Sequence, residues 1–122
     1  MNVKERIIYT KLDSLSKSKF RSKFKLTDED KAYIKNNGID KIIKHAYNFI
    51  NERLASEIIL NDGKQTPMSG HPVFIAQHAT GTCCRCCLLK WHGIDKNKQL
   101  SDKEINYVVS IIISWIIRKM KK

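Results

Sequence analysis

The chain has 122 residues, which suits a single domain with one hydrophobic core. Its 42% hydrophobic and 29% charged residues are those of an ordinary globular protein, and with only two prolines and five glycines it is not expected to contain a long flexible linker. The net charge of +11 favours partners that carry phosphate or an anionic surface, although solubility and genome composition also produce basic chains.

The positive charge lies at the two ends of the chain and in its centre. Residues 1–25 carry eight lysines or arginines against two acids, whereas residues 26–63 carry five against seven. Residues 64–100 again carry five basic residues, with a single acid. We therefore expect the basic N-terminal segment and the central segment to contribute most to attraction of an anion.

The N-terminal segment predicts a short helix over 3–16, followed by SKFRSKF at 18–24. Phe20 and Phe24 are four residues apart and share one helical face, so we expect both rings to dock on the core. The basic side chains of the same stretch are then expected to point outward: Lys19, Arg21 and Lys23.

Two helices are predicted before the centre of the chain. Thr27 is a suitable N-cap for a helix that starts with acidic residues and ends at Gly38. A second helix begins after Asp40, and its apolar residues recur at helical spacing to about Ala55. Residues 57–72 hold both prolines and two glycines and predict a loop.

The centre and the end of the chain predict three more helices. Residues 73–80 can form one, with a proline in its first turn, and residues 82 or 83 to 91 another that ends near Gly93. Ser101 and Glu104 fit a capping box at the start of a final helix that runs to about residue 119. The predicted fold is mainly α, a compact single domain over 1–122 with four to six helices and at most a small β element.

The final helix, 101–119, also predicts self-association. Its apolar residues cover nearly every direction, and a helix that is apolar all round must be buried all round. In so small a chain one face could bury against a second copy, so we expect a homodimer or a higher homo-oligomer.

A cytoplasmic protein without a membrane partner is expected. The N-terminus has no long apolar stretch typical of a signal peptide. The longest apolar run, residues 107–117, falls short of the roughly 20 residues that span a bilayer. All four cysteines lie within five residues, so they cannot staple distant loops, and we expect reduced thiols.

The cysteines offer a first hypothesis, a metal site. Cys84 and Cys87 form a C-x-x-C pair, and His78 and His92 lie six residues before it and five after it. These four residues could give zinc a tetrahedral shell of nitrogen and sulfur. The simpler alternative is that small thiols fill a tight helix contact.

A second hypothesis is a pocket for phosphate or a nucleotide. Arg85 near a helix N-terminus would combine a bidentate fork with the helix dipole, and Trp91 could stack on a base. The alternative is that these residues cap helices and pack the core. The candidate ligand-binding residues are Lys64, Gln65, His71, Gln77, His78, Arg85, Lys90, Trp91 and His92.

A third hypothesis is catalysis. His71 and His78 are seven residues apart, so a continuous helix would place them on one face, where one could serve as a base and a cysteine as nucleophile. Residues 64–94 contain no carboxylate to orient a histidine, and no catalytic signature is present. We therefore lean against an enzyme.

The central sequence carries a resemblance. Four stretches resemble the small bacterial and phage family called domain of unknown function 4186. They are SKFRSKF at 18–24, NDGKQTPM at 61–68, GHPVFIAQHAT at 70–80 and CCRCCLLKWHGI at 83–94. The resemblance implies that the site lies in 61–94, but the family name carries no activity. The family's cysteine stretch reads Cys-Cys-Arg-Gly-Cys, and Cys86 stands in place of that glycine.

These patterns predict a protein that binds a phosphate-bearing ligand. A small nucleotide is the favoured class, and sequestering a nucleotide signal would serve phage counter-defence. One alternative is a zinc-dependent or thiol-dependent enzyme that acts on nucleotides. The other is a nucleic-acid-binding module, whose affinity would fall with salt. Its contacts would be Lys17, Lys19, Arg21, Lys23 and Lys25, with Arg118, Lys119, Lys121 and Lys122.

Overall fold

The computed structural model describes residues 2–121 and confirms an all-helical single domain. No strand occurs among these residues, and the helices outnumber the predicted four to six because a single-turn helix, α2, is also present. The helices are α1 (Val3–Ser16), α2 (Lys19–Ser22), α3 (Asp28–Asn37), α4 (Ile39–Arg53), α5 (Pro72–Thr80), α6 (Arg85–His92) and α7 (Asp102–Met120).

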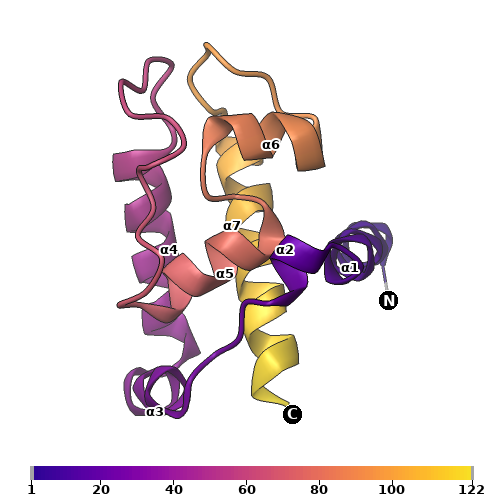
Figure 1. Cartoon of the computed structure of the whole chain (residues 1–122), viewed down its shortest axis with the longest axis vertical. Helices are drawn as coiled ribbons and strands as arrows, with labels where there is room; N and C mark the ends of the chain where they lie inside the picture. Colours follow the sequence, from indigo (N-terminus) through magenta and orange to yellow (C-terminus); the bar gives the residue numbers. More distant parts are fainter. Residues whose placement is uncertain (1, 122) are drawn as a thin grey trace.

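Helix α5 is the centre of the fold. Figure 1 shows α4 and α7 side by side, with α5 crossing in front of them and α6 across the N-terminal end of α7. Helix α5 packs against α1, α2, α3, α4 and α7, and every one of its residues is buried. The predicted 57–72 loop is confirmed up to residue 71, and α5 begins at Pro72.

The helix ends follow the capping residues of the sequence. Thr27 and Ser101 form capping boxes with Asp30 and Glu104, as the sequence predicts for the latter. Gly81 and Gly93 end α5 and α6 in the left-handed conformation. A Cβ atom on Gly81 would lie 2.8 Å from Cδ1 of Trp91, so this glycine also permits close packing of α6 on the end of α5.

Helix α7 is covered largely by its own chain. It packs against α1, α4 and α5, and Val108, Ile111, Ile112 and Ile116 are fully buried. Its exposed apolar residue Ile117 retains 41% of its surface. Because intrachain packing accounts for most of the apolar surface of α7, self-association stays a prediction. Within residues 2–121 no helix is both apolar and long enough to cross a bilayer.

The SKFRSKF segment is oriented differently from the prediction. Phe24 is buried as expected, but Phe20 keeps 46% of its surface exposed and Arg21 only 8%. The physical reason is tertiary: Arg21 finds hydrogen-bond acceptors on α5 and α6. The Phe20 ring instead meets the edge of Phe24 and the cations of Arg21 and Lys23. The prediction of an outward Arg21 and a buried Phe20 was therefore wrong.

Candidate functional site

The candidate site is built around the first turn of α6. Cys84 is the N-cap residue, and its Sγ accepts a hydrogen bond from the Cys87 amide at 3.4 Å. The Asp62 carboxylate, from the preceding loop, accepts the amide of Arg85 at 2.9 Å and that of Cys86 at 3.3 Å. A carboxylate thus occupies the position at the helix N-terminus where a phosphate would bind.

Asp62 is held in the ionised form. Burial raises the pKa of its carboxyl, but three hydrogen bonds outweigh burial. They come from the Gln65 side chain, the Arg85 backbone amide and the Cys86 side chain. Lys96, 3.6 Å away, adds electrostatic stabilisation. The pKa of Asp62 is lowered to about 2 as a result, so the carboxylate caps α6 at any ordinary pH.

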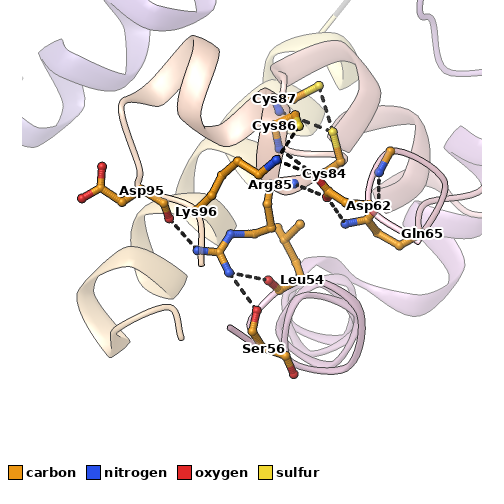
Figure 2. A network of polar contacts seen from close by, with 11 residues as sticks. Leu54, Ser56, Asp62, Gln65, Cys84, Arg85, Cys86, Cys87, Asp95 and Lys96 are labelled. Carbon is orange, nitrogen blue, oxygen red and sulfur yellow. Dashed lines mark hydrogen bonds and ion pairs between the residues drawn. The ribbon is translucent and has the colours of Figure 1, made fainter. Parts of the chain in front are cut away.

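Arg85 joins three segments of the chain, and both of its terminal nitrogens are occupied by hydrogen bonds within the chain. Its Nη1 donates to the carbonyls of Leu54 at 3.2 Å and Ser56 at 2.9 Å, and its Nη2 to that of Asp95 at 2.7 Å (Figure 2). Nη2 also donates to the carbonyl of Lys98 at 2.9 Å. The side chain is 3% exposed. All four Nη–H groups are occupied, so Arg85 fixes α6 to the end of α4 and to the loop after α6.

Three thiols meet beside this turn. The Sγ atom of Cys87 lies 3.2 Å from that of Cys84 and 3.5 Å from that of Cys83. All three Sγ atoms fall within 4.8 Å of one another, and this is the one group of three or more potential metal ligands found within residues 2–121. Cys83 and Cys84 are buried, whereas Cys87 is half-buried, so the cluster opens to solvent on the Cys87 side.

The fourth thiol lies outside the cluster. Cys86 is exposed, and its Sγ accepts a hydrogen bond from Lys96 Nζ at 2.9 Å (Figure 2). The cluster thus consists of Cys83, Cys84 and Cys87, and it does not include the position where the sequence departs from the family's Cys-Cys-Arg-Gly-Cys pattern.

A buried arginine supplies positive charge to the thiol cluster. Nη2 of Arg21 lies 3.1 Å from Cys87 Sγ, and Nη1 lies 3.6 Å from Cys83 Sγ. Nη1 also donates to the carbonyl of His78 at 2.7 Å, which fixes α2 on α5. Burial lowers the pKa of Arg21, but its bonds to sulfur outweigh burial and leave the pKa raised.

The thiols share protons unequally. Hydrogen bonds from Cys83, Cys84 and Arg21 lower the pKa of the Cys87 thiol far below its ordinary value. Hydrogen bonds with the thiols of Cys83 and Cys87, together with burial, raise the pKa of the Cys84 thiol. Among the three thiols, the surroundings thus favour the thiolate most at Cys87, where two neighbouring thiols and a guanidinium can donate hydrogen bonds to the sulfur.

The two histidines of the predicted zinc shell lie elsewhere. Nε2 of His78 lies 3.1 Å from the carbonyls of both Thr66 and Pro67. Nε2 of His92 lies 2.7 Å from the carbonyl of Thr80, which can only accept, so His92 carries its proton there and Nδ1 accepts from the Tyr107 hydroxyl. Backbone carbonyls thus engage both rings, and Cys83 is the third residue that joins Cys84 and Cys87.

His71 is also engaged within the chain. Its Nδ1 accepts the amide of Val73 at 3.0 Å as the N-cap of α5, and its Nε2 lies 3.0 Å from Nδ1 of His45. Burial, aided by His45, lowers the pKa of His71 to about 4. Burial likewise lowers the pKa of His92 to about 4. His71 precedes α5, and His78 lies within it, so the structure does not form the predicted pair of histidines on one helix.

Most residues of the predicted phosphate pocket serve the fold. Gln65 bonds the Gly63 amide and Asp62, and Gln77 is 1% exposed and donates to the Thr82 carbonyl. Trp91 is half-buried against Gly81. Six of the nine predicted side chains donate or accept hydrogen bonds inside the chain: Gln65, His71, Gln77, His78, Arg85 and His92. Lys64 and Lys90 are exposed.

The sequence offered little signal for two members of the site. Cys83 immediately precedes the N-cap, and its sulfur joins the cluster because the backbone of Cys84 is extended, with φ of −157°. Arg21 lies 62 residues before Cys83 in the chain and reaches it only through the packing of α2. Asp62 lies just before the stretch 64–94 that contains no carboxylate, and its role as a cap of α6 was not predicted.

Comparison with known families supports the resemblance noted in the sequence. The sequence model of the family described as domain of unknown function (DUF4186) matches residues 9–117, which is most of the chain. The match includes the three clustered cysteines, Arg21 and Asp62. No solved structure matches the chain.

Proposed function

The chain belongs to the family described as domain of unknown function (DUF4186), and because membership assigns no activity, we propose a function from the geometry of the site. We propose that the protein binds a soft metal ion, zinc in first place, through Cys83, Cys84 and Cys87. The observation that carries the proposal is the approach of three Sγ atoms to within 4.8 Å of one another.

The spacing of the sulfurs supports this proposal. Zinc–sulfur bonds of about 2.3 Å in a tetrahedron place the sulfurs about 3.8 Å apart. The observed separations from Cys87 are 3.2 and 3.5 Å, so small side-chain rotations would open the cluster to hold an ion. Thiolates are soft ligands that favour zinc or monovalent copper over magnesium or calcium.

The charge of the site supports the same proposal. Three thiolates and one divalent ion carry a net charge of −1, and the Arg21 guanidinium beside Cys83 and Cys87 would balance it. Three protein ligands leave the fourth position of a zinc ion to water or to another ligand. Half-buried Cys87 would place that open position toward solvent.

Native mass spectrometry of gently purified protein, compared with the denatured mass, tests the proposal. We expect the added mass of one metal ion per chain, retained in Cys86→Ser and lost in Cys87→Ser. Cys86→Ser is the matched control because its thiol lies outside the cluster. Reduced protein that stays metal-free after dialysis against zinc would contradict the proposal. The same spectra report the subunit number and any bound nucleotide.

A phosphate-bearing ligand, a small nucleotide in first place, is a second and weaker proposal, and sequestering a signal in phage counter-defence depends on it. Support comes from the net charge of +11 and from the exposed amines of Lys64 and Lys90. We expect cyclic or linear nucleotides to raise the melting temperature, and Lys64→Ala with Lys90→Ala to abolish that increase. Unchanged melting temperatures across both nucleotide classes would remove this proposal.

A further inference from the structure

A second surface of the molecule combines an exposed aromatic ring with basic side chains. We propose that this surface, which we call the α2 face and define as Phe20 with Lys17, Lys19 and Lys23, binds single-stranded nucleic acid. The proposal is independent of the metal site, because it rests on different residues.

The aromatic ring of the α2 face is exposed, and other rings of the protein pack against its inner side. Phe20 retains 46% of its surface, and its ring meets Phe24 edge-on with centroids 5.3 Å apart. Phe24 in turn stacks on the imidazole of buried His78 at 5.4 Å. Phe20 is thus held on a rigid stack that ends in central helix α5. A fixed, exposed ring of this kind is what a nucleobase stacks on.

The charges around Phe20 are unopposed. Lys17, Lys19 and Lys23 are exposed, and within residues 2–121 none of their amines forms an ion pair with a carboxylate. Lys23 Nζ lies 4.4 Å from the Phe20 ring centroid. The stretch 14–27 contains no acid at all. Such a cluster of cations around one ring complements a phosphate backbone whose bases are unstacked.

The fold brings the basic C-terminal end to the same place. A hollow of about 180 Å³ lies between α1, α2, α5 and the end of α7. Its lining includes Arg21 and Ser22 on one side and Arg118 and Lys119 on the other. Two basic stretches that are far apart in the sequence therefore flank one depression. Arg21 is buried against α5 and the thiols, and Arg118 is paired with Asp13 at 3.0 Å, so the charge available to a ligand comes mainly from the α2 face.

The shape favours a single strand over a duplex. Helix α2 has four residues, which is too short to fill a major groove as a recognition helix does. In a duplex the bases are stacked on one another and cannot reach the Phe20 ring, whereas a single strand exposes each base face. We therefore expect binding with little preference for sequence and a steep dependence on salt.

Fluorescence anisotropy with a labelled thymidine oligonucleotide of about 15 residues tests the proposal, with the matching duplex as comparison. We expect the single strand to bind more tightly than the duplex at low salt. Phe20→Ala should weaken binding about 5- to 150-fold, and Phe20→Trp should retain it. Equal affinity for strand and duplex, or no effect of Phe20→Ala, would overturn the proposal.

A matched pair of triple variants separates local contacts from net charge. Lys17, Lys19 and Lys23 changed together to alanine should weaken binding and flatten its salt dependence. The same change at exposed Lys35, Lys41 and Lys44 removes equal charge from α3 and α4 and should have a much smaller effect. Equal losses in the two triples would overturn the proposal. Retained binding in Cys87→Ser would separate this result from the outcome of the metal experiment.

Discussion

Two buried arginines lie at the first turn of α6, Arg85 as its first residue and Arg21 from α2, and their hydrogen-bond partners differ in kind. Arg85 donates to four backbone carbonyls through its two Nη atoms and is 3% exposed, so these donors are used in joining segments of the fold. Arg21 donates to one carbonyl and to two sulfurs. Carbonyls neither ionise nor bind soft metals, whereas thiols do both. We infer that Arg85 stabilises the structure and that Arg21 tunes the chemistry.

The largest expected loss of stability follows substitution of Arg85. Arg85→Lys keeps the charge, but a single ammonium cannot reach four carbonyls, and the buried acceptors left unpaired should lower the free energy of unfolding by about 3 kcal/mol. Urea denaturation measures this loss. Arg21→Lys is the matched variant and should cost about 1 kcal/mol while weakening metal binding. Equal destabilisation by the two substitutions would contradict the assigned roles.

A smaller loss of stability is expected where Trp91 of α6 packs against the end of α5. Gly81→Ala should lower the free energy of unfolding by about 2 kcal/mol, because φ is +69° and the new Cβ would lie 2.8 Å from Trp91. Gly93→Ala has φ of +67° but nothing within 4 Å, so it should cost only about 1 kcal/mol. Thermal or urea unfolding of both proteins gives the difference, and equal losses would argue against close packing of Trp91.

Acid should weaken the framework through its neutral histidines. The pKa of His71 is lowered to about 4, so the unfolded chain, with a pKa near about 6.5, binds more protons between these values. The contribution of His71 to stability is therefore full above about pH 6.5 and falls as the pH drops toward 4. The Cys87 thiolate acts in the same direction, whereas Asp62, with a pKa of about 2, matters only at lower pH.

His71→Asn isolates the histidine contribution, because asparagine can still cap α5. Between pH 7 and pH 5, wild type should lose about 1.5 kcal/mol more than this variant in urea denaturation. Identical pH dependence in the two proteins would show that folding does not lower the pKa of His71, and would contradict this prediction.

The smallest effect is expected at the thiol outside the cluster. Cys86 is exposed, and its thiol contacts Lys96 and the Asp62 carboxylate, both of which a serine hydroxyl can also reach. Cys86→Ser should therefore change the free energy of unfolding by less than about 0.5 kcal/mol. Its alkylation should also leave metal content unchanged. A loss of metal in Cys86→Ser would move the ligand set away from Cys83.

The sequence predicted the framework well because local signals decide it. The caps at Thr27 and Ser101 and the stops at Gly38 and Gly93 are short-range features, and α3, α6 and α7 begin or end at them. The pairing of Cys84 with Cys87 across one helical turn is equally local. Such features could be read directly from spacing.

Long-range contacts explain what the sequence left open. His78 and His92 carry plausible ligand atoms, but carbonyls brought in by the loop at 66–67 and by the end of α5 engage them. The burial of Arg21 depends on acceptors more than 50 residues away in the chain. Spacing within a segment carries no information about such partners, so the third thiol and its arginine emerged only from the fold.

A cobalt titration followed by absorption tests the central claim most directly. Cobalt takes tetrahedral thiolate sites like those of zinc, and its sulfur-to-metal charge-transfer band reports the thiolates bound. We predict saturation at one cobalt per chain, the same intensity in Cys86→Ser, and a reduced band in each of the variants Cys83→Ser, Cys84→Ser and Cys87→Ser. A fully reduced protein that develops no such band, or a band that depends on Cys86, would contradict the three-thiol site.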